Sequence, residues 1–482
     1  MPAPRRLLLP TLAVTVTVTA VLQTLVVPIL GTLSRQLHAS VSAVGWVVTA
    51  NLLAAAVLTP VLGRLGDLHG RKRVVLAILA AVVAGSALAA TTSSLGLLIA
   101  GRVLQGSAFG LFPLSIGIVR DELPPQRLNG AMAVVSGTLG VGGGLGLVLT
   151  GLLTNGGADY HRVFWLATGV GVAALVAAAL VIPDRRPAGR GRVDWLGAAV
   201  LGAGLVLLLL ALSQGHTWGW GSPLTIGLLV ASLLVLVAWR WVERTVASPL
   251  VSPVLLSCRP LLVTNAAGLC VGVAMFVSFL GVSSFVQTPT AVGYGFTASV
   301  LAASSAYLLP GALFGIIAAP AGGRLVTRYG ARLTLALAGT VGVAGFALIA
   351  VLHDASWQLI TGSLLVNGAV SLAYAAMPAL IVAEVEPSQT GVANSVNSIA
   401  RSVGSSLASA LVITLLTSDV LPSGLPSESA YVAAFATGAL AMAAVVALAL
   451  TGLRGVPRPT DDELEAEHAT TLAGEWATVS VG

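Results

Sequence analysis

Two arginines lie inside long apolar stretches of the sequence. Arg102 falls several residues into one stretch, and Arg401 falls about ten residues into another. A guanidinium stays protonated in proteins and carries five N–H donors, so each can bind an anion, order water or fix backbone carbonyls, but neither can act as a base. The two cysteines, Cys258 and Cys270, lie 12 residues apart, and the six histidines fall outside the apolar stretches. Since no nucleophile, base or metal-ligand cluster emerges, we expect no enzyme, no metal and no cofactor.

The elements that carry these arginines must be membrane helices. Of the 482 residues, 56% are hydrophobic and 9% are charged, and the mean hydropathy is +0.96, whereas soluble domains carry roughly 25% charged residues. Such a chain is not a soluble enzyme, a disordered chain or, despite its net charge of +6, a nucleic-acid-binding protein. Fourteen runs are long and apolar enough to span a bilayer: Leu7–Leu30, Val41–Gly63, Val74–Thr92, Leu95–Val119, Leu128–Leu153, Val163–Ile182, Trp195–Leu212, Leu224–Val242, Leu261–Val286, Phe296–Ala321, Leu333–Leu352, Trp357–Val382, Val392–Leu416 and Tyr431–Leu453.

The basic residues are distributed unevenly between alternate loops. With the first residues inside the cell, 20 of the 24 basic residues fall in or beside cytoplasmic segments, two fall in outer loops (Arg35 and Arg162) and two fall inside helices. This bias follows the positive-inside rule and places both termini in the cytoplasm. Because one missed or extra helix would invert every later loop, the bias also supports the even count. We expect a multi-pass monomer of the cell membrane.

A weak internal repeat divides the chain. Residues 63–70 after the second predicted helix read Gly-Arg-Leu-Gly-Asp-Leu-His-Gly, and residues 323–330 after the tenth read Gly-Arg-Leu-Val-Thr-Arg-Tyr-Gly. Repeats of this kind are typical of alternating-access transporters, whose substrate site lies between the halves. We expect an N-terminal six-helix bundle (1–183), a two-helix insert with its linkers (184–260, including a second linker Glu243–Pro260), a C-terminal six-helix bundle (261–453) and a cytoplasmic tail (454–482).

Three short motifs carry a resemblance to a known family. Residues 63–73, Gly-Arg-Leu-Gly-Asp-Leu-His-Gly-Arg-Lys-Arg, resemble the signature that joins the second and third helices of the major facilitator superfamily. Residues 98–106, Leu-Ile-Ala-Gly-Arg-Val-Leu-Gln-Gly, resemble its fourth-helix signature. With fourteen helices, a two-helix insert and the opening Asp-Trp-Leu-Gly at 194–197, the chain is similar to the 14-helix drug:proton antiporters, which are multidrug and natural-product exporters.

The resemblance implies a fold and a function. The fold is an all-α integral membrane protein with two pseudo-symmetric six-helix bundles and two central inserted helices. The function is secondary active export of small amphipathic drugs, antibiotics or natural products by alternating access, in exchange for protons. No GxxxxGK[ST] motif is present, so ATP is not expected to drive it. An importer, a facilitator or a lipid flippase of the same fold remains open, as does, with less support, a receptor or a membrane enzyme. The expected partners are a small substrate, protons and the lipid bilayer, without nucleic acid.

The 63–73 motif predicts a conformational latch on the cytoplasmic side. The resemblance suggests that Asp67 faces the N-terminus of the helix Val392–Leu416 near Gly391, where a carboxylate is favoured by the helix dipole. A solvated, positively biased loop is the other interpretation. The expected latch residues are Gly63, Asp67, Gly70, Arg71, Arg73, Asp121 and Glu122, with Arg324, Arg328, Glu384 and Glu386 as the pseudo-symmetric counterpart. Among them, Asp67, Asp121, Glu122 and Glu384 are the candidates for the group that binds the transported proton.

Two further groups of residues are expected inside the bundle. Arg102 must face protein or a water-filled cavity; it either couples protons or substrate, with Gln105 and Gly106 beside it for packing and hydrogen bonding, or donates to backbone carbonyls of the first two helices. The glycines of the fifth helix lie on more than one face, and small residues four apart let helices approach closely, either as a deforming interface or as static packing. They are Gly140, Gly142, Gly143, Gly144, Gly146 and Gly151; the prolines typical of the family are replaced by Gly143 and Leu147.

Polar and aromatic side chains at mid-membrane depth are candidates for the substrate cavity. The family often has an acidic residue in the first helix, but here residues 22–24 read Leu-Gln-Thr. Because the only charges expected within the membrane are Arg102 and Arg401, and an unpaired cation in a low-dielectric cavity is costly, we expect neutral or anionic substrates. The cavity candidates are Gln23, Asn51, Asn265, Phe276, Phe279, Phe285, Tyr307, Tyr374, Asn394, Asn397 and Arg401.

Overall fold

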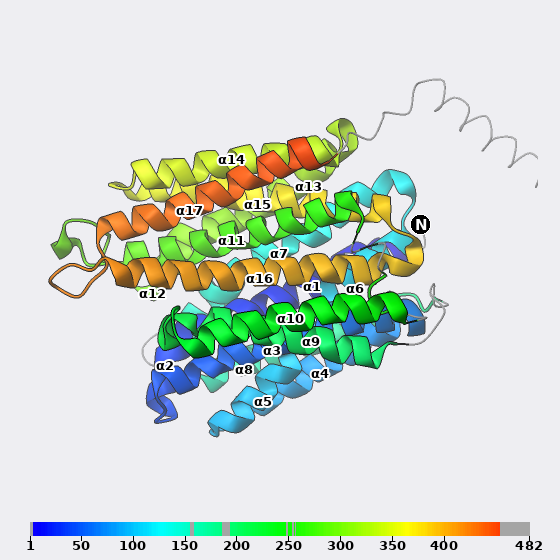
Figure 1. Ribbon diagram of the computed structural model, residues 1–482, viewed down its shortest axis with the longest axis horizontal. Helices are drawn as coiled ribbons and strands as arrows, with labels where there is room; N and C mark the ends of the chain where they lie inside the picture. The colour runs from blue at the N-terminus through cyan, green and yellow to red at the C-terminus, as the bar shows by residue number, and fades with distance from the viewer. Residues whose placement is uncertain are drawn as a thin grey trace, which may run out of the picture.

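The computed structural model describes residues 3–154, 159–185, 193–246, 249–252, 255 and 257–453 of the chain. Within these residues the regular structure is helical, apart from an isolated bridge between Val420 and Pro426, and 14 helices are long and apolar enough to span a membrane. This confirms the predicted all-α fold and the predicted count. The long helices run side by side in one bundle, with the described N-terminal residues at one end (Figure 1). The predicted cytoplasmic tail, residues 454–482, lies outside the described residues.

The helices follow the predicted apolar runs and mostly extend one or two turns beyond them. The spanning elements are α1 (Ala3–Thr24), α3 (Val41–His69), α4 (Arg71–Thr91), α5 (Leu95–Gln105) with η2 (Gly106–Gly110) and α6 (Leu111–Glu122), α7 (Pro125–Leu153), α8 (His161–Val181), α9 (Trp195–Trp218), α10 (Pro223–Thr245), α11 (Arg259–Gln287), α12 (Val300–Ala302) with the π-helical η5 (Ala303–Leu308) and α13 (Leu309–Tyr329), α14 (Ala331–Val351), α15 (Ser356–Glu384), η6 (Pro387–Gln389) with α16 (Thr390–Ser418), and α17 (Glu428–Ala447) with η7 (Leu448–Gly452). Short pieces η1 (Val27–Ile29) and α2 (Leu30–Gln36) follow α1, and η4 (Thr290–Val292) follows α11.

Glycine makes the sharp turn at the same place in both repeats. Gly70 joins α3 to α4 with φ +99°, and Gly330 joins α13 to α14 with φ +86°. A residue with a Cβ is strained in this region of φ, whereas glycine is not. The paired glycines of the repeat therefore have a conformational reason, and the intervening basic residues fall at the ends of helices.

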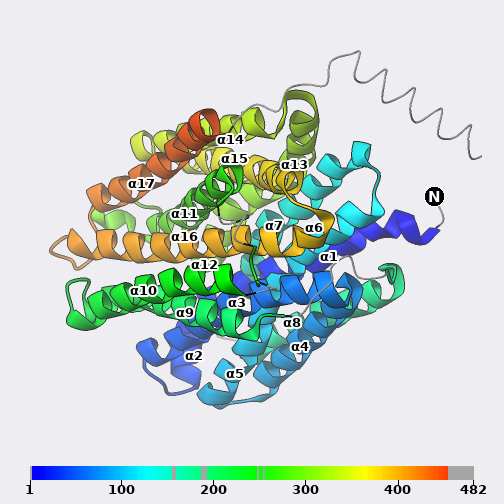
Figure 2. The same ribbon diagram turned by 45° about the vertical axis from the view of Figure 1, so that its right-hand side comes forward.

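Three buried apolar clusters hold the described residues together. One is built from α1 to α8, a second mainly from α11 to α17, and a third joins the inserted helices α9 and α10 to α3, α15 and α16. Figure 1 and Figure 2 both show α9 and α10 lying side by side, next to α3 and α16. The insert thus packs against helices of both six-helix groups.

Two sequence predictions of boundaries need correction. The first run, predicted as Leu7–Leu30, is interrupted after Thr24, and the chain continues through η1 into the separate α2. Helix α10 continues to Thr245, so Glu243 is not in a linker: it lies in the last turn of that helix and is 1% exposed. Apolar packing of Leu250 and Val251, each at most 1% exposed, covers this turn and allows it to remain helical beyond the apolar run.

Candidate functional site

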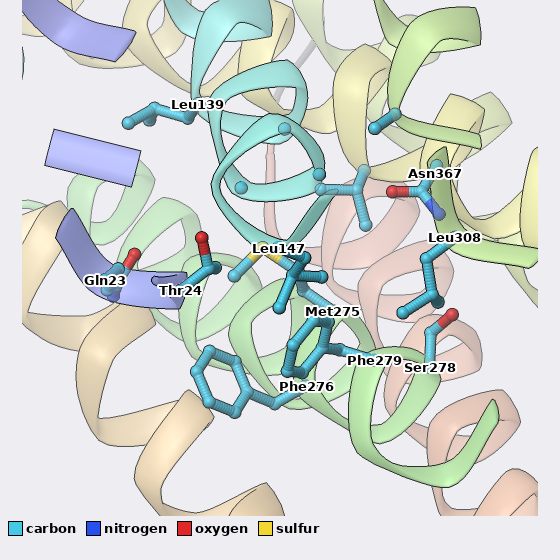
Figure 3. Close-up of a pocket in the computed structure, with 15 residues that line it drawn as sticks. Gln23, Thr24, Leu139, Leu147, Met275, Phe276, Ser278, Phe279, Leu308 and Asn367 are labelled. Atoms are coloured by element: carbon cyan, nitrogen blue, oxygen red, sulfur yellow. The ribbon is translucent and has the colours of Figure 1, made fainter. Parts of the chain in front are cut away.

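A cavity lies in the middle of the bundle between the two six-helix groups. Its larger lobe is lined from α1, α7, α11, α15 and the start of α13. We call it the aromatic lobe because Phe276 and Phe279 of α11 face Gln23 and Thr24 of α1 across it (Figure 3). Asn367 of α15 lies on its far wall, and its amide donates to Ser363 O at 2.9 Å.

A second, smaller lobe adjoins the first and shares Gln23, Leu139 and Met275 with it. We call it the arginine lobe, because the side chain of Arg401 is part of its wall. Its other lining residues are Thr19, Phe109, Phe112, Tyr374, Ser398, Ser402 and Ser405. The cavity as a whole therefore combines an apolar, aromatic surface with one fixed cation and several hydroxyl groups.

Arg401 is held by side chains rather than by an anion. Its Nη1 donates to Asn397 Oδ1 at 2.7 Å and its Nη2 donates to Ser398 Oγ at 2.9 Å. The guanidinium carbon lies 4.9 Å from the centroid of the Phe112 ring and 5.0 Å from that of the Tyr374 ring, which favours cation–π attraction to one ring from each half. Among the described residues no carboxylate pairs with this cation. Arg401 is 8% exposed, at the cavity wall.

Arg102 has a different environment. It is 1% exposed and donates from Nε to Val47 O at 3.1 Å and from Nη1 to Leu22 O at 3.1 Å, which joins α5 to α3 and α1. Nη1 also donates to Gln105 Oε1 at 2.6 Å, and Gln105 donates to Ser86 Oγ at 2.7 Å. This geometry favours the interpretation in which Arg102 fixes backbone carbonyls of the first two helices.

Several predicted cavity residues lie elsewhere. Asn51 is 2% exposed and donates to Arg102 O at 2.9 Å, so it joins helices instead of facing the cavity. Tyr307 shares a hydrogen bond of 2.8 Å with Ser356, at the outer end of α15. Asn394 donates to Thr390 O at 3.0 Å within its own helix. The sequence predicts how deep each of these residues lies in the membrane. It does not predict which face of the helix carries the side chain, and that face determines which residues the side chain contacts.

Two other candidates also point away from the cavity wall. Phe285 is 1% exposed and packs among Tyr294, Phe296 and Tyr431 near the outer end. Asn397 is 1% exposed and donates to Thr264 O at 3.2 Å. Its Oδ1, one turn before Arg401 on α16, accepts from the guanidinium and so orients it. The sequence analysis missed Thr24, Met275, Asn367, Phe112 and the serines of α16. Residues of these types are common in membrane helices, so a single one does not mark a cavity wall in the sequence.

The glycines of α7 bring three helices close. A Cβ at Gly142 would stand 3.0 Å from Thr17 O, and one at Gly146 would stand 3.0 Å from Val21 O, both on α1. A Cβ at Gly144 would collide with Ala312 of α13, and one at Gly151 would stand 3.1 Å from Leu301. Small residues at these positions therefore let α7 touch α1 and the α12–α13 segment at once.

The remaining two glycines of this group line the aromatic lobe. A Cβ at Gly140 would have only Ser371 Oγ within reach, at 3.9 Å, and a Cβ at Gly143 would make an ordinary contact with Thr24 at 3.6 Å. Gly106 serves another contact: a Cβ there would stand 2.8 Å from Asn51 O, where η2 crosses α3. The predicted glycines therefore differ in what an added side chain would contact.

A second site joins the halves at the end of the bundle that the charge bias assigns to the cytoplasm; we call it the cytoplasmic gate. Asp67 is 1% exposed, and its Oδ2 accepts from the backbone N–H of Val392, in the first turn of α16, at 3.4 Å. A Cβ at Gly391 would stand 2.9 Å from Gly63 O, so glycines allow α3 and α16 to touch here. Arg71 donates to Asp67 Oδ1 at 2.8 Å.

Two arginines of the first half extend the gate across the interface. Arg71 donates to Pro387 O at 2.9 Å and forms an ion pair with Asp121. Arg120, which the sequence analysis did not select, donates to Thr390 Oγ1 at 2.5 Å and to Val385 O at 2.8 Å. Three side chains of α3, α4 and α6 thus bond to the segment where α15 ends and α16 begins: Asp67, Arg71 and Arg120. Asp121 holds Arg71 in place.

The sequence leaves open whether Arg71 or Arg73 pairs with Asp121 or Glu122, and the structure forms the Arg71–Asp121 pair. Arg73 is largely exposed and lies 3.7 Å from Asp184, whereas Glu122 pairs with Arg185. In the part of the chain that the structure describes, no ion pair joins Arg324 or Arg328 to Glu384 or Glu386. The corresponding turn is exposed and Arg328 lies over the ring of Tyr329, but the end of α13 still contacts the other half: Asn129 of α7 donates to Thr327 Oγ1 at 3.5 Å, and a Cβ at Gly323 would stand 2.9 Å from Gly130 Cα.

Comparison with known proteins explains this combination of elements. The family model described as "Major Facilitator Superfamily" matches residues 12–409, and again residues 271–477. The chain belongs to this superfamily. Its members are transporters and not enzymes, which confirms both the resemblance in the sequence and the expected multi-pass membrane location.

Relatives within the superfamily include exporters of antibiotics. The chain is 30% identical over 397 residues to the tetracenomycin C resistance and export protein of Streptomyces glaucescens, covering 81% of this chain and 72% of that protein. It is 28% identical over 400 residues to a probable actinorhodin transporter of Streptomyces coelicolor, covering 79% and 67%. It is also 33% identical to uncharacterised MFS-type transporters of Mycobacterium tuberculosis, covering 73% of this chain but about half (49%) of their length.

A solved structure shows the same superfamily fold. The human organic anion transporter MFSD10 (TETRAN) superposes with a TM-score of 0.64 over 92% of this chain and 100% of that chain. The two sequences are 19% identical, so the likeness concerns the fold alone.

Proposed function

We propose that the protein is a secondary active exporter of small amphipathic molecules, neutral or anionic, that works by alternating access in exchange for protons. Antibiotic export by the related Streptomyces protein supports the substrate class. A central cavity lined from α1 and α7 of one half and from α11, α15 and α16 of the other supports alternating access, since relative movement of the halves would expose it to either side. We further propose the four segments 1–183, 184–260, 261–453 and 454–482 as its domains.

The observation that carries the substrate preference is Arg401 in the arginine lobe. The guanidinium lies at the cavity wall beside Phe112 and Tyr374, with two side-chain oxygens as its hydrogen-bond acceptors. An aromatic carboxylate or phenolate placed in this lobe would pair with the cation while its rings contact Phe276 and Phe279. A lipophilic cation would meet an uncompensated like charge, which is costly in a low-dielectric cavity.

Exchange for protons rests on the family resemblance, and the gate offers groups for it. The sequence candidates for the proton site were Asp67, Asp121, Glu122 and Glu384. All but the exposed Glu384 are engaged by arginine in this conformation. If one of the three paired carboxylates carries the proton, protonation would release its arginine and with it a contact of the gate.

The test is transport of a matched series of aromatic compounds that differ only in charge. Accumulation of anionic, neutral and quaternary ammonium forms is measured in an efflux-deficient bacterial host, with and without a protonophore. We expect export of the anionic and neutral forms, its abolition by the protonophore, and a selective loss of anion export in Arg401→Gln that Arg401→Lys largely restores. Arg162→Gln, which changes an exposed arginine in the first turn of α8, is the control.

Two results would contradict the proposal. Strong export of quaternary ammonium compounds without preference for neutral or anionic ones would contradict the substrate class. Export that continues with the protonophore present, or net uptake along a gradient, would instead favour a facilitator or an importer of the same fold.

A further inference from the structure

Glu243 is a buried carboxyl group that no ion pair and no well-aligned hydrogen bond holds among the described residues. It lies in the last turn of α10 and is 1% exposed, and in the described structure neither of its carboxyl oxygens accepts a hydrogen bond. Asp67 is the other acidic residue buried to this degree among the described residues, and it is paired with Arg71. The indole Nε1 of Trp239, one turn earlier on α10, is also buried and unpaired. The backbone N–H groups of Leu250 and Val251 and the Trp239 indole are its nearest donors, but none makes a well-aligned hydrogen bond with it, and in the described residues no basic side chain forms an ion pair with Glu243.

A second carboxyl group lies beside it. Asp194 caps α9: its Oδ1 accepts from the backbone N–H of Gly197 at 2.9 Å, while its Oδ2 is buried without a partner. A Cβ at Gly197 would collide with Asp194 Oδ2 and stand 2.9 Å from Glu243 Oε1. Both acids therefore approach the same glycine, whose missing side chain makes room for them.

Among the described residues, no basic side chain forms an ion pair with Asp194 or Glu243. Arg240 and Arg244 lie on the same helix as Glu243, and Arg240 donates to Ser257 Oγ at 3.4 Å. Arg64 of α3, Glu384 of α15, Cys258 and Arg259 at the start of α11 are the other ionisable groups on neighbouring elements. The segment that covers the pair, Pro249–Ser252, carries no ionisable side chain.

We propose that Asp194 and Glu243 form a proton-binding site, in which one proton is held by Glu243 at neutral pH and its release loosens the cytoplasmic gate. A lone carboxylate in an apolar surrounding, next to a second carboxylate, is disfavoured by lost hydration and by like-charge repulsion, and protonation removes both costs. The proton that leaves Glu243 passes to cytoplasmic water. The sequence analysis missed this site because it placed Glu243 in a linker.

The connection to the gate runs through shared apolar contacts. Trp239, Leu250 and Val251, which surround the site, belong to the same buried cluster as Val385 and Val392. Val385 supplies the carbonyl that Arg120 binds, and Val392 supplies the N–H that Asp67 binds. Ionised, repelling carboxylates would draw in water and separate the end of α10 from the start of α9, which removes packing support from the gate.

The first test reads the proton directly. Infrared spectra of the full-length protein in lipid nanodiscs, recorded against pH, should contain the carbonyl stretch of a protonated carboxyl group that disappears as pH rises above neutral. Glu243→Gln should remove this band, whereas Asp184→Asn, which changes an exposed carboxyl group near the insert, should keep it. If Glu243→Gln does not fold, Asp194→Asn serves instead: without its like-charged neighbour, Glu243 should ionise at lower pH. Spectra that are identical in wild type and Glu243→Gln would overturn the proposal.

The second test reads the gate without requiring transport. Cys258 lies 3.7 Å from Glu384 at the cytoplasmic end, and with Cys270→Ser it becomes the single cysteine of the chain. The rate of labelling by a membrane-impermeant maleimide is measured in inverted vesicles for the Cys270→Ser parent and for the same parent carrying Glu243→Gln. The result is expressed as the ratio of the parent rate to the Glu243→Gln rate, because the thiolate fraction of Cys258 rises with pH in both proteins. The ratio should rise several-fold above neutral pH. A ratio that does not change with pH would overturn the coupling to the gate, whatever the protein transports.

Discussion

At the scale of single residues, the two intramembrane arginines show what a sequence does and does not determine. Both were predicted inside helices because charge stands out against an apolar run. Their different environments depend on residues far away in sequence: Leu22 and Val47 offer carbonyls to Arg102, while Phe112 and Tyr374 place Arg401 between two rings at a cavity wall. Periodicity gives the depth of a side chain but not its neighbours, so the roles needed the structure.

Replacing Arg102 should mainly destabilise the fold. Arg102→Gln would leave the carbonyls of Val47 and Leu22 without their donor, and each unsatisfied buried group costs about 1–3 kcal/mol. We expect a clear fall in the thermal unfolding temperature of the purified protein and low membrane abundance. Arg401→Gln, whose side chain bonds only to other side chains of α16, should unfold near the wild-type temperature while its transport selectivity changes. Equal destabilisation by both substitutions would contradict this division of roles.

At the scale of elements, hydropathy predicted the helices, and charge bias predicted their orientation. It did not predict the breaks within them, such as the 3-10 segment Gly106–Gly110 or the π-helical segment Ala303–Leu308. These depend on backbone hydrogen bonding and local packing, to which an average over many residues is insensitive. The multiple faces of the α7 glycines were predicted from spacing; which helix each face meets was not.

The packing of α7 against α1 makes a testable difference between two neighbouring glycines. In Gly146→Ala the new methyl group would stand 3.0 Å from Val21 O and 3.1 Å from Val21 Cα, so backbone must move. In Gly143→Ala it would make an ordinary contact at the edge of the aromatic lobe. We expect Gly146→Ala to lower the free energy of unfolding by about 1–3 kcal/mol, the usual cost of overpacking, and so to lower the unfolding temperature. Transport should fall as well. Gly143→Ala should leave stability unchanged; a loss as large as that of Gly146→Ala would show that the close approach is not the cause.

At the scale of the whole molecule, the repeat predicted two equivalent latches, whereas the two contacts between the halves differ in chemistry. Both repeats make the same glycine turn, at Gly70 and Gly330, but in the described residues the charged side chains that bond across the halves lie beside the first. At the second, Thr327 occupies the repeat position of Asp67, and the contact is a hydrogen bond of 3.5 Å from Asn129 together with the close approach of Gly323 to Gly130. A repeat in sequence preserves the turn because glycine conformation requires it, but the charge of the contact depends on individual side chains that the two repeats do not share.

This asymmetry determines which charges should control closure. Asp67→Asn removes the carboxylate at the first turn of α16, and Arg120→Gln removes bonds to Val385 O and Thr390 Oγ1. Either change should raise the labelling of cysteines introduced at the cytoplasmic face of the cavity and lower transport several-fold, with membrane abundance retained. Arg328→Gln, at the matching turn of the second repeat, removes an exposed guanidinium that lies over Tyr329 and forms no ion pair among the described residues, so labelling should stay at the wild-type level. If Arg328→Gln opened the cytoplasmic side as much as Arg120→Gln, closure would depend on both turns, and a single one-sided gate could not account for it.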